Sequence, residues 1–241
     1  MKKIVLTTVC ALAVTGAAFA QGNVAWNLIT PAAMTADTNS TAYSPLMGGG
    51  SAVGGAVGLT GTAYAGFDYE LLYTTYSGTQ ATITTLASLL AWNDTGLSAT
   101  NASSAGHLVP VAGTTAAQVP WSPGTTDSIV LVGWSADLGA SWASVSNILA
   151  AAAAGNNAPL QAQLAGNQGF LGISTTGFTT TFATSVNPGA SLFGTAPIAN
   201  QGTPIFSLNT PLYLVPVPEP TTLALAGLGG LSLLLFRRQR K

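Results

Sequence analysis

The chain has 241 residues, of which only 5% are charged, with six Lys or Arg, seven Asp or Glu and one His. All six basic residues lie at the two ends of the chain, and none occurs between positions 21 and 217. Because that stretch carries six acidic residues and no basic one, nucleic acid is excluded as a partner and anionic substrates are disfavoured.

Residues 1–20 have the pattern of a secretory signal peptide. Two lysines at positions 2 and 3 precede an apolar run, and Ala18, Phe19 and Ala20 form an A-x-A cleavage site. Cleavage after Ala20 makes Gln21 the first residue of the exported protein. The only cysteine, Cys10, lies within the apolar run and is removed with it. The exported chain therefore has no disulfide and no thiol nucleophile or metal ligand.

Residues 21–215 are long enough for one exported domain with a core of its own. Thr, Ser, Asn and Gly dominate this stretch, with aromatic residues at intervals. We predict a mainly β fold, namely a single jelly-roll-like β-sandwich with one or two short helices. The first strand is expected at 23–29, and the glycine-rich stretch at 48–58 is interpreted as a surface loop because it lacks a phosphate-binding motif.

The clearest alternation of apolar and polar residues lies between Thr62 and Ser77. Phe67, Tyr69 and their i+2 neighbours predict a buried face, which places Asp68 and Glu70 on the opposite, solvent-facing side, about 7 Å apart. A catalytic carboxylate pair and a calcium site are the alternatives for these two acids. We favour a solvated strand face, because no positioned partner or calcium-loop pattern accompanies them.

The centre of the chain contains the strongest strand and helix patterns. A strand is predicted over residues 125–134, because the continuous apolar run at 129–132 suits a strand buried on both sides. Apolar spacing predicts a helix over 140–154, and Pro159 and Gly166 frame a second short one. Residues 81–92 fit a strand or a short helix. Further short strands are expected within 170–182 and 203–214.

We predict that the exported body is not an enzyme and carries no cofactor. The single histidine, His107, has no second histidine, cysteine or nucleophile elbow to work with, so a packing role is favoured. A glycan-acting enzyme using the acidic residues is the less favoured alternative. Exposed Trp26, Trp92 and Trp121 would instead indicate a carbohydrate-binding module, although buried positions are favoured for them.

The last 26 residues form a tripartite tail. The tail begins with a rigid proline-containing segment, Val217, Pro218, Glu219 and Pro220. An uncharged stretch at 221–236 follows it. As a helix it is roughly 24 Å long, which is slightly short for a bilayer core of about 30 Å. The basic end, at 237–241, is expected to stay cytoplasmic and to act as a membrane stop. Its charged residues are Arg237, Arg238, Arg240 and Lys241.

This tail resembles the PEP-CTERM sorting signal of exported bacterial proteins, with Pro218, Glu219 and Pro220 as the motif and Arg237 and Arg238 as the stop. The resemblance implies anchoring in the inner membrane with the body outside the cytoplasm, and processing by exosortase, a membrane enzyme. We therefore expect a protein of the cell surface or extracellular matrix with a structural or interaction role. Binding of extracellular polysaccharide is the alternative.

The body also resembles a recurrent type of exported domain among PEP-CTERM proteins. The residues that carry this resemblance are Trp134, Gly139, Ser141, Trp142 and the segment Phe206-Ser207-Leu208. No activity is implied by it.

Overall fold

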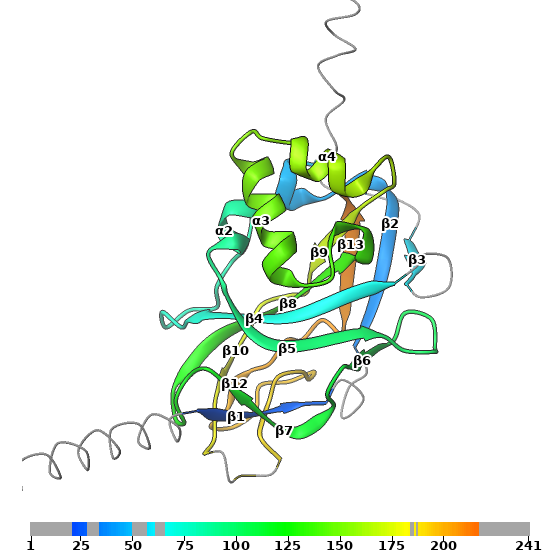
Figure 1. Ribbon diagram of the computed structural model, residues 1–241. Coiled ribbons are helices and arrows are strands. Elements are labelled where there is room, and N and C mark those ends of the chain that lie inside the picture. Colours follow the sequence, from blue (N-terminus) through cyan, green and yellow to red (C-terminus); the bar gives the residue numbers. More distant parts are fainter. Residues whose placement is uncertain are drawn as a thin grey trace, which may run out of the picture.

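The computed structural model describes residues 21–27, 34–49, 57–60, 66–183, 186 and 188–216. The mainly β class predicted from the sequence is confirmed: a ten-stranded curled sheet, a three-stranded sheet and short helices make up these residues (Figure 1). The strand order does not establish the finer prediction of a jelly-roll sandwich. The predicted signal peptide, most of the glycine-rich stretch and the tail from Val217 onward lie outside the described residues.

Strand β8 (Thr126–Ser135) is the centre of the large sheet and confirms the prediction of a strand buried on both sides. Every residue of β8 after Thr126 is buried. Along one edge it pairs with β4 (Phe67–Thr75) through nine residue pairs, and along the other it pairs with β9 (Phe170–Ile173) and β10 (Gly177–Thr180). Its neighbours on both sides are therefore fixed by backbone hydrogen bonds.

The large sheet has the strand order β3-β2-β13-β9-β8-β4-β5-β6, and β10 continues from β8 to β12. Its pairs are antiparallel except for β2 with β13, which run parallel. The remaining members are β2 (Thr35–Tyr43), β3 (Val57–Leu59), β5 (Asn93–Asn101), β6 (Leu108–Pro110), β12 (Gly202–Thr203) and β13 (Asn209–Leu214). The predicted closing segment Phe206-Ser207-Leu208 lies just before β13 rather than in a strand.

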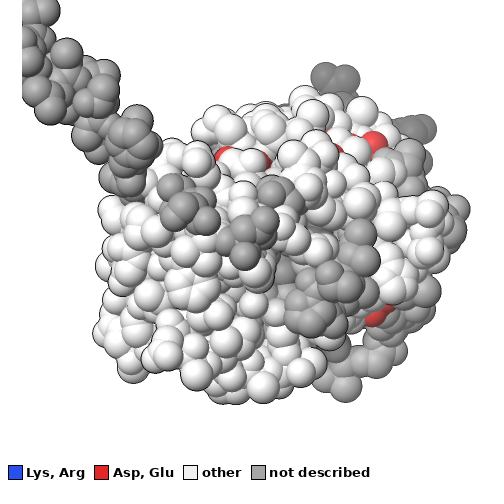
Figure 2. Space-filling model, turned by 90° about the horizontal axis from the view of Figure 1, so that it is seen from below, with Lys and Arg blue, Asp and Glu red and all other residues white. Residues whose placement is uncertain are grey.

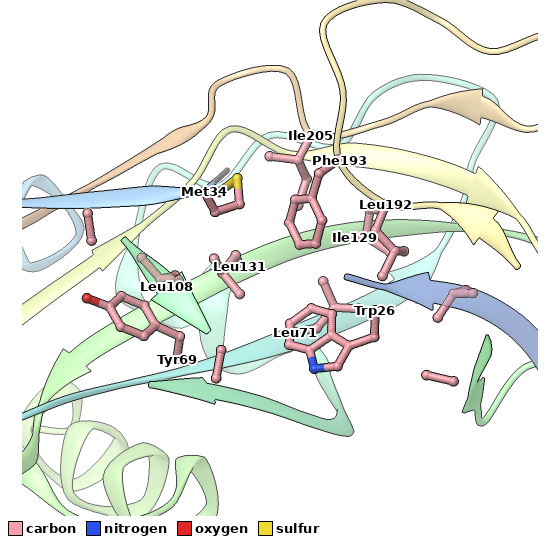
Figure 3. Close-up of a cluster of buried hydrophobic side chains, with 14 of the residues drawn as sticks. Trp26, Met34, Tyr69, Leu71, Leu108, Ile129, Leu131, Leu192, Phe193 and Ile205 are labelled. Carbon is pink, nitrogen blue, oxygen red and sulfur yellow. The ribbon is translucent and has the colours of Figure 1, made fainter. Parts of the chain in front are cut away.

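A small sheet covers one face of the large one. Its order is β11-β1-β7, with β1 (Gly22–Trp26) between β7 (Thr114–Val119) and β11 (Ala190–Ser191). Between the two sheets lies a core in which Trp26 packs against Phe193, with 5.8 Å between the ring centroids (Figure 3). Strand β1, close to the start of the described residues, is thus largely buried.

Three helices cover the opposite face of the large sheet: α2 (Leu86–Leu90), α3 (Trp142–Ala153) and α4 (Ala158–Leu164). Their apolar side chains pack on Leu72, Val130 and Val132, which form a second core. The predicted helices at 140–154 and 159–166 are confirmed. The stretch at 81–92, whose sequence fits a strand or a short helix, contains α2. Thr85 and Ser88 form a reciprocal capping box at the N-terminus of this helix.

Substitution of Leu131 by alanine tests the importance of the central strand. Leu131 is fully buried in the core between the sheets, so the loss of its side chain is expected to lower the free energy of unfolding by about 2 to 5 kcal/mol. Val111→Ala is the control, because Val111 is 65% exposed and its change should stay within about 0.5 kcal/mol. Urea unfolding followed by tryptophan fluorescence measures both, and equal losses would contradict the assignment.

Candidate functional site

The last strand of the domain holds the chain firmly up to the residue before the tail. β13 lies between β2 and β9, and Leu212 in it is fully buried. Beyond the strand, the Val215 N–H donates to the Gly169 carbonyl at 2.8 Å, and the Val215 side chain is buried. Pro216 follows directly, so the tail begins where the packed domain stops.

The tail leaves the domain at the end that carries the helices. Pro216 lines a groove of about 450 Å³ together with Met47, Leu86 and Ala153, and no charged residue lines it. In Figure 1, β13 rises to this end beside α4, whereas β1 and β7 lie at the opposite end. The start of the described chain at β1 and the end of β13 therefore lie at opposite ends of the domain.

A family model for the PEP-CTERM protein-sorting motif matches residues 216–241. The chain carries a PEP-CTERM sorting motif. The motif indicates an exported protein that is sorted by an exosortase, as its sequence resemblance implied. No curated protein and no solved structure matches the chain. The comparisons therefore concern the tail and give no activity for the body.

The individual tail and cleavage residues stay predictions. The described residues do not include the PEP-CTERM motif, the stretch 221–236 or the basic end. They do not include Ala18 and Ala20 of the predicted cleavage site either. Gln21 is described and exposed, next to the start of β1. Among the described helices none is long and apolar enough to cross a membrane.

Glu70 does not face solvent, which corrects the prediction for this residue. Helix α3 covers this face of β4, and the Trp142 N–H at the first turn of the helix donates to Glu70 Oε2 at 3.0 Å. Glu70 as a whole residue is 9% exposed. The alternation along β4 reveals that Glu70 shares a face with Leu72, but not that a later helix covers that face.

Burial and, next in size, the nearby carboxyl of Asp94, to which Glu70 is hydrogen-bonded, together raise the pKa of Glu70 from 4.5 to about 7. The Trp142 N–H opposes this rise by favouring the charged form. Burial also raises the pKa of Asp68, which is half-buried. Two neighbouring carboxyls such as those of Glu70 and Asp94 can act in acid–base chemistry. The Glu70 carboxyl, however, accepts the Trp142 N–H at the start of α3, and this helix covers it.

The other predicted side chains do not gather around these carboxyls. His107 is half-buried and forms an isolated backbone bridge with Thr35. Trp26 and Trp121 are buried in the core between the sheets, as favoured, and only Trp92 keeps a half-exposed position. No group of three or more metal-ligating side chains occurs among the described residues.

Four of the residues that carry the domain resemblance, Trp134, Gly139, Ser141 and Trp142, form one local unit. The Trp134 indole N–H donates to the Gly139 carbonyl at 2.7 Å, and the Trp134 and Trp142 rings lie 5.8 Å apart. Ser141 caps α3 by accepting a hydrogen bond from the Ser144 N–H. These residues turn the chain from β8 into α3, which indicates a structural role.

Replacement of Glu70 by glutamine is expected to change how stability depends on pH. Because the folded-state pKa lies above that of an exposed Glu, the protonated form stabilises the fold at low pH. The free energy of unfolding should therefore fall as the pH rises from about 4.5 to about 7, and this fall should be smaller in Glu70→Gln, which keeps an oxygen for the Trp142 N–H. Urea unfolding at pH 4 to 8 measures it, and identical pH profiles would contradict it.

Two truncations test where the packed domain ends. A chain of residues 21–216 should keep the unfolding midpoint of the full chain, because the backbone anchor at Val215 is retained. A chain ending at Pro211 loses buried Leu212 and half of β13, so it should not fold. Circular dichroism during heating compares them. A cooperative transition in the shorter chain would show that β13 is dispensable.

Proposed function

We propose that the protein is exported, anchored in the inner membrane by residues 221–236 with its body outside the cytoplasm, and processed by exosortase for the cell surface or extracellular matrix. The observation that carries this proposal is the match of residues 216–241 to the sorting motif, directly after the last buried residue of the domain. The predicted signal peptide at 1–20 supports the same route.

The position of Pro216 adds a geometric consequence to this proposal. Residues 216–220 separate the domain from the proposed membrane helix, and five extended residues span at most about 18 Å. The end of the domain that carries α2, α3 and α4 therefore faces the membrane closely. The segment that the exosortase must reach lies in this narrow gap.

A structural or interaction role suits the body better than catalysis. Glu70 is buried and accepts the Trp142 N–H at the start of α3, so its carboxyl is not presented to a substrate. Polysaccharide binding is the second candidate, although buried Trp26 and Trp121 are unsuited to stacking on sugars. A glycan-acting enzyme is less favoured, because Glu70 and Asp127 are buried and Asp37 and Asp68 are half-buried among the described acidic residues.

The double substitution Glu219→Ala/Pro220→Ala tests sorting in the native host. It is expected to abolish processing, so that the full tail stays in the membrane fraction and release falls at least tenfold. Gln239→Ala is the control, because it changes the tail outside the predicted motif and keeps the basic residues. Intact-mass analysis of membrane and extracellular fractions measures both variants. An unchanged distribution of the double variant would refute the sorting proposal.

A further inference from the structure

A groove in two connected compartments runs over the helix-bearing face of the large sheet. The first, of about 390 Å³, lies between residues 80–83, which lead into α2, and residues 173–176, which connect β9 to β10. The second, of about 140 Å³, is lined by Ser44, Leu46 and Tyr213 among others. Ile83 and Ile173 line both compartments, which makes them one elongated groove.

Hydrogen bonds between its two walls hold the first compartment in shape. The Gln80 side-chain amide donates to the Thr176 carbonyl at 2.6 Å, and the Thr176 hydroxyl donates to the Ala81 carbonyl at 2.6 Å. From beneath, Ser174 Oγ accepts the N–H of Leu131 at 3.0 Å. Because the walls are tied to each other and to β8, the groove is preformed and needs little ordering on binding.

The lining of the groove is uncharged and combines hydroxyl and amide groups with aliphatic side chains. Gln80, Thr82 and Thr175 are exposed along it, and the two isoleucines supply apolar surface. Sugar rings present the matching combination of hydroxyl groups and apolar C–H faces. The described residues include no Lys or Arg that could neutralise carboxylate or sulfate groups, and the face in Figure 2 accordingly shows no basic atoms.

An aromatic pair comes from the two chain segments that continue from the walls of the groove, four residues before Gln80 and two residues after Thr176. Tyr76 and Phe178 are stacked, with 4.4 Å between centroids and 23° between ring planes. Phe178, the second residue of β10, comes two residues after Thr176, which lines the groove just before the strand begins. Tyr76 stays half-exposed, and its backbone N–H is fixed by the buried carboxyl of Asp127. The pair offers a rigid apolar platform next to the polar groove.

The second compartment contains a buried hydroxyl without a partner. Ser44 is fully buried, and its Oγ makes no hydrogen bond to the other described residues. A buried hydroxyl in this state is unfavourable by about 1–3 kcal/mol unless a bound group satisfies it. A hydroxyl of a ligand that enters the groove past Ile83 would supply such a partner.

An extended polypeptide fits the groove less well. Peptides that bind along a sheet usually pair with a free strand edge. β9 has none at this place, because Ile173 pairs with Val132 on one side and Gly172 pairs with Leu212 on the other. The groove therefore offers side-chain groups instead of unpaired backbone.

We propose that this groove binds a chain of neutral sugars, with one sugar ring on Tyr76 and the following rings along residues 80–83 and 173–176. The inference rests on the proposed surface role and identifies the class of partner for it. It places the aromatic platform at half-exposed Tyr76 instead of at the candidate tryptophans Trp26, Trp92 and Trp121.

The test uses the full chain in lipid nanodiscs and isothermal titration with laminarin, dextran and xylan as neutral probes, and with alginate as a polyanionic probe. Binding of at least one neutral probe and none of alginate is expected. Tyr76→Ala and Gln80→Ala should each weaken binding about tenfold, which corresponds to a loss of about 1.4 kcal/mol. Tyr43→Ala is the matched control, because Tyr43 is 54% exposed and does not line the groove.

Failure to bind any neutral probe, binding of alginate alone, or equal binding by wild type and the groove variants would each overturn the inference. If Tyr76→Ala does not fold, as judged by circular dichroism, Gln80→Ala decides, because that side chain is exposed. Glu219→Ala/Pro220→Ala should bind the probes as the wild type does. A failure of sorting is thereby distinguished from a failure of the groove.

Discussion

The burial of β8 on both faces is the constraint on which the rest of the structure depends. Leu131 points into the core beneath the small sheet, and its neighbours Val130 and Val132 point into the core beneath the helices. A strand with two apolar faces is stable only when a layer covers each of them. The small sheet and the helices are those layers, and β4 and β9 align with β8 because their backbone groups must pair with it.

The helix-bearing layer connects the stability of the domain with its proposed functions. A buried carboxyl, Glu70, fixes the start of α3, and the Trp134 unit turns the chain into it. Pro216 leaves the domain at the end formed by these helices, beside an apolar groove. The proposed sugar groove follows the segment that leads into α2 on the same face of the sheet. Membrane attachment and ligand binding would thus use neighbouring parts of one layer.

The absence of Lys and Arg between positions 21 and 217 restricts the partners of the body. Because the body has no Lys or Arg to pair with, its buried carboxylates are held by N–H groups and by each other, as Glu70 is by the Trp142 N–H and by Asp94. A net negative body repels polyanions and favours neutral partners. After the predicted cleavage at residue 20, the remaining basic residues would all lie in the tail, where the proposed membrane stop needs them.

The sequence by itself determined the sorting tail, β8 and α3. The tail is recognised by a linear motif, β8 by an apolar run and α3 by helical spacing of apolar residues, and each of these signals lies within one short segment of the chain. It did not reveal β2, whose Thr- and Ala-rich residues become a strand through parallel pairing with β13, far along the chain. Nor could it place Glu70, whose face is polar or buried depending on where α3 packs. The groove joins residues near 44, 80 and 174. Only tertiary structure decides such features, because their energy comes from contacts between distant segments and not from local pattern.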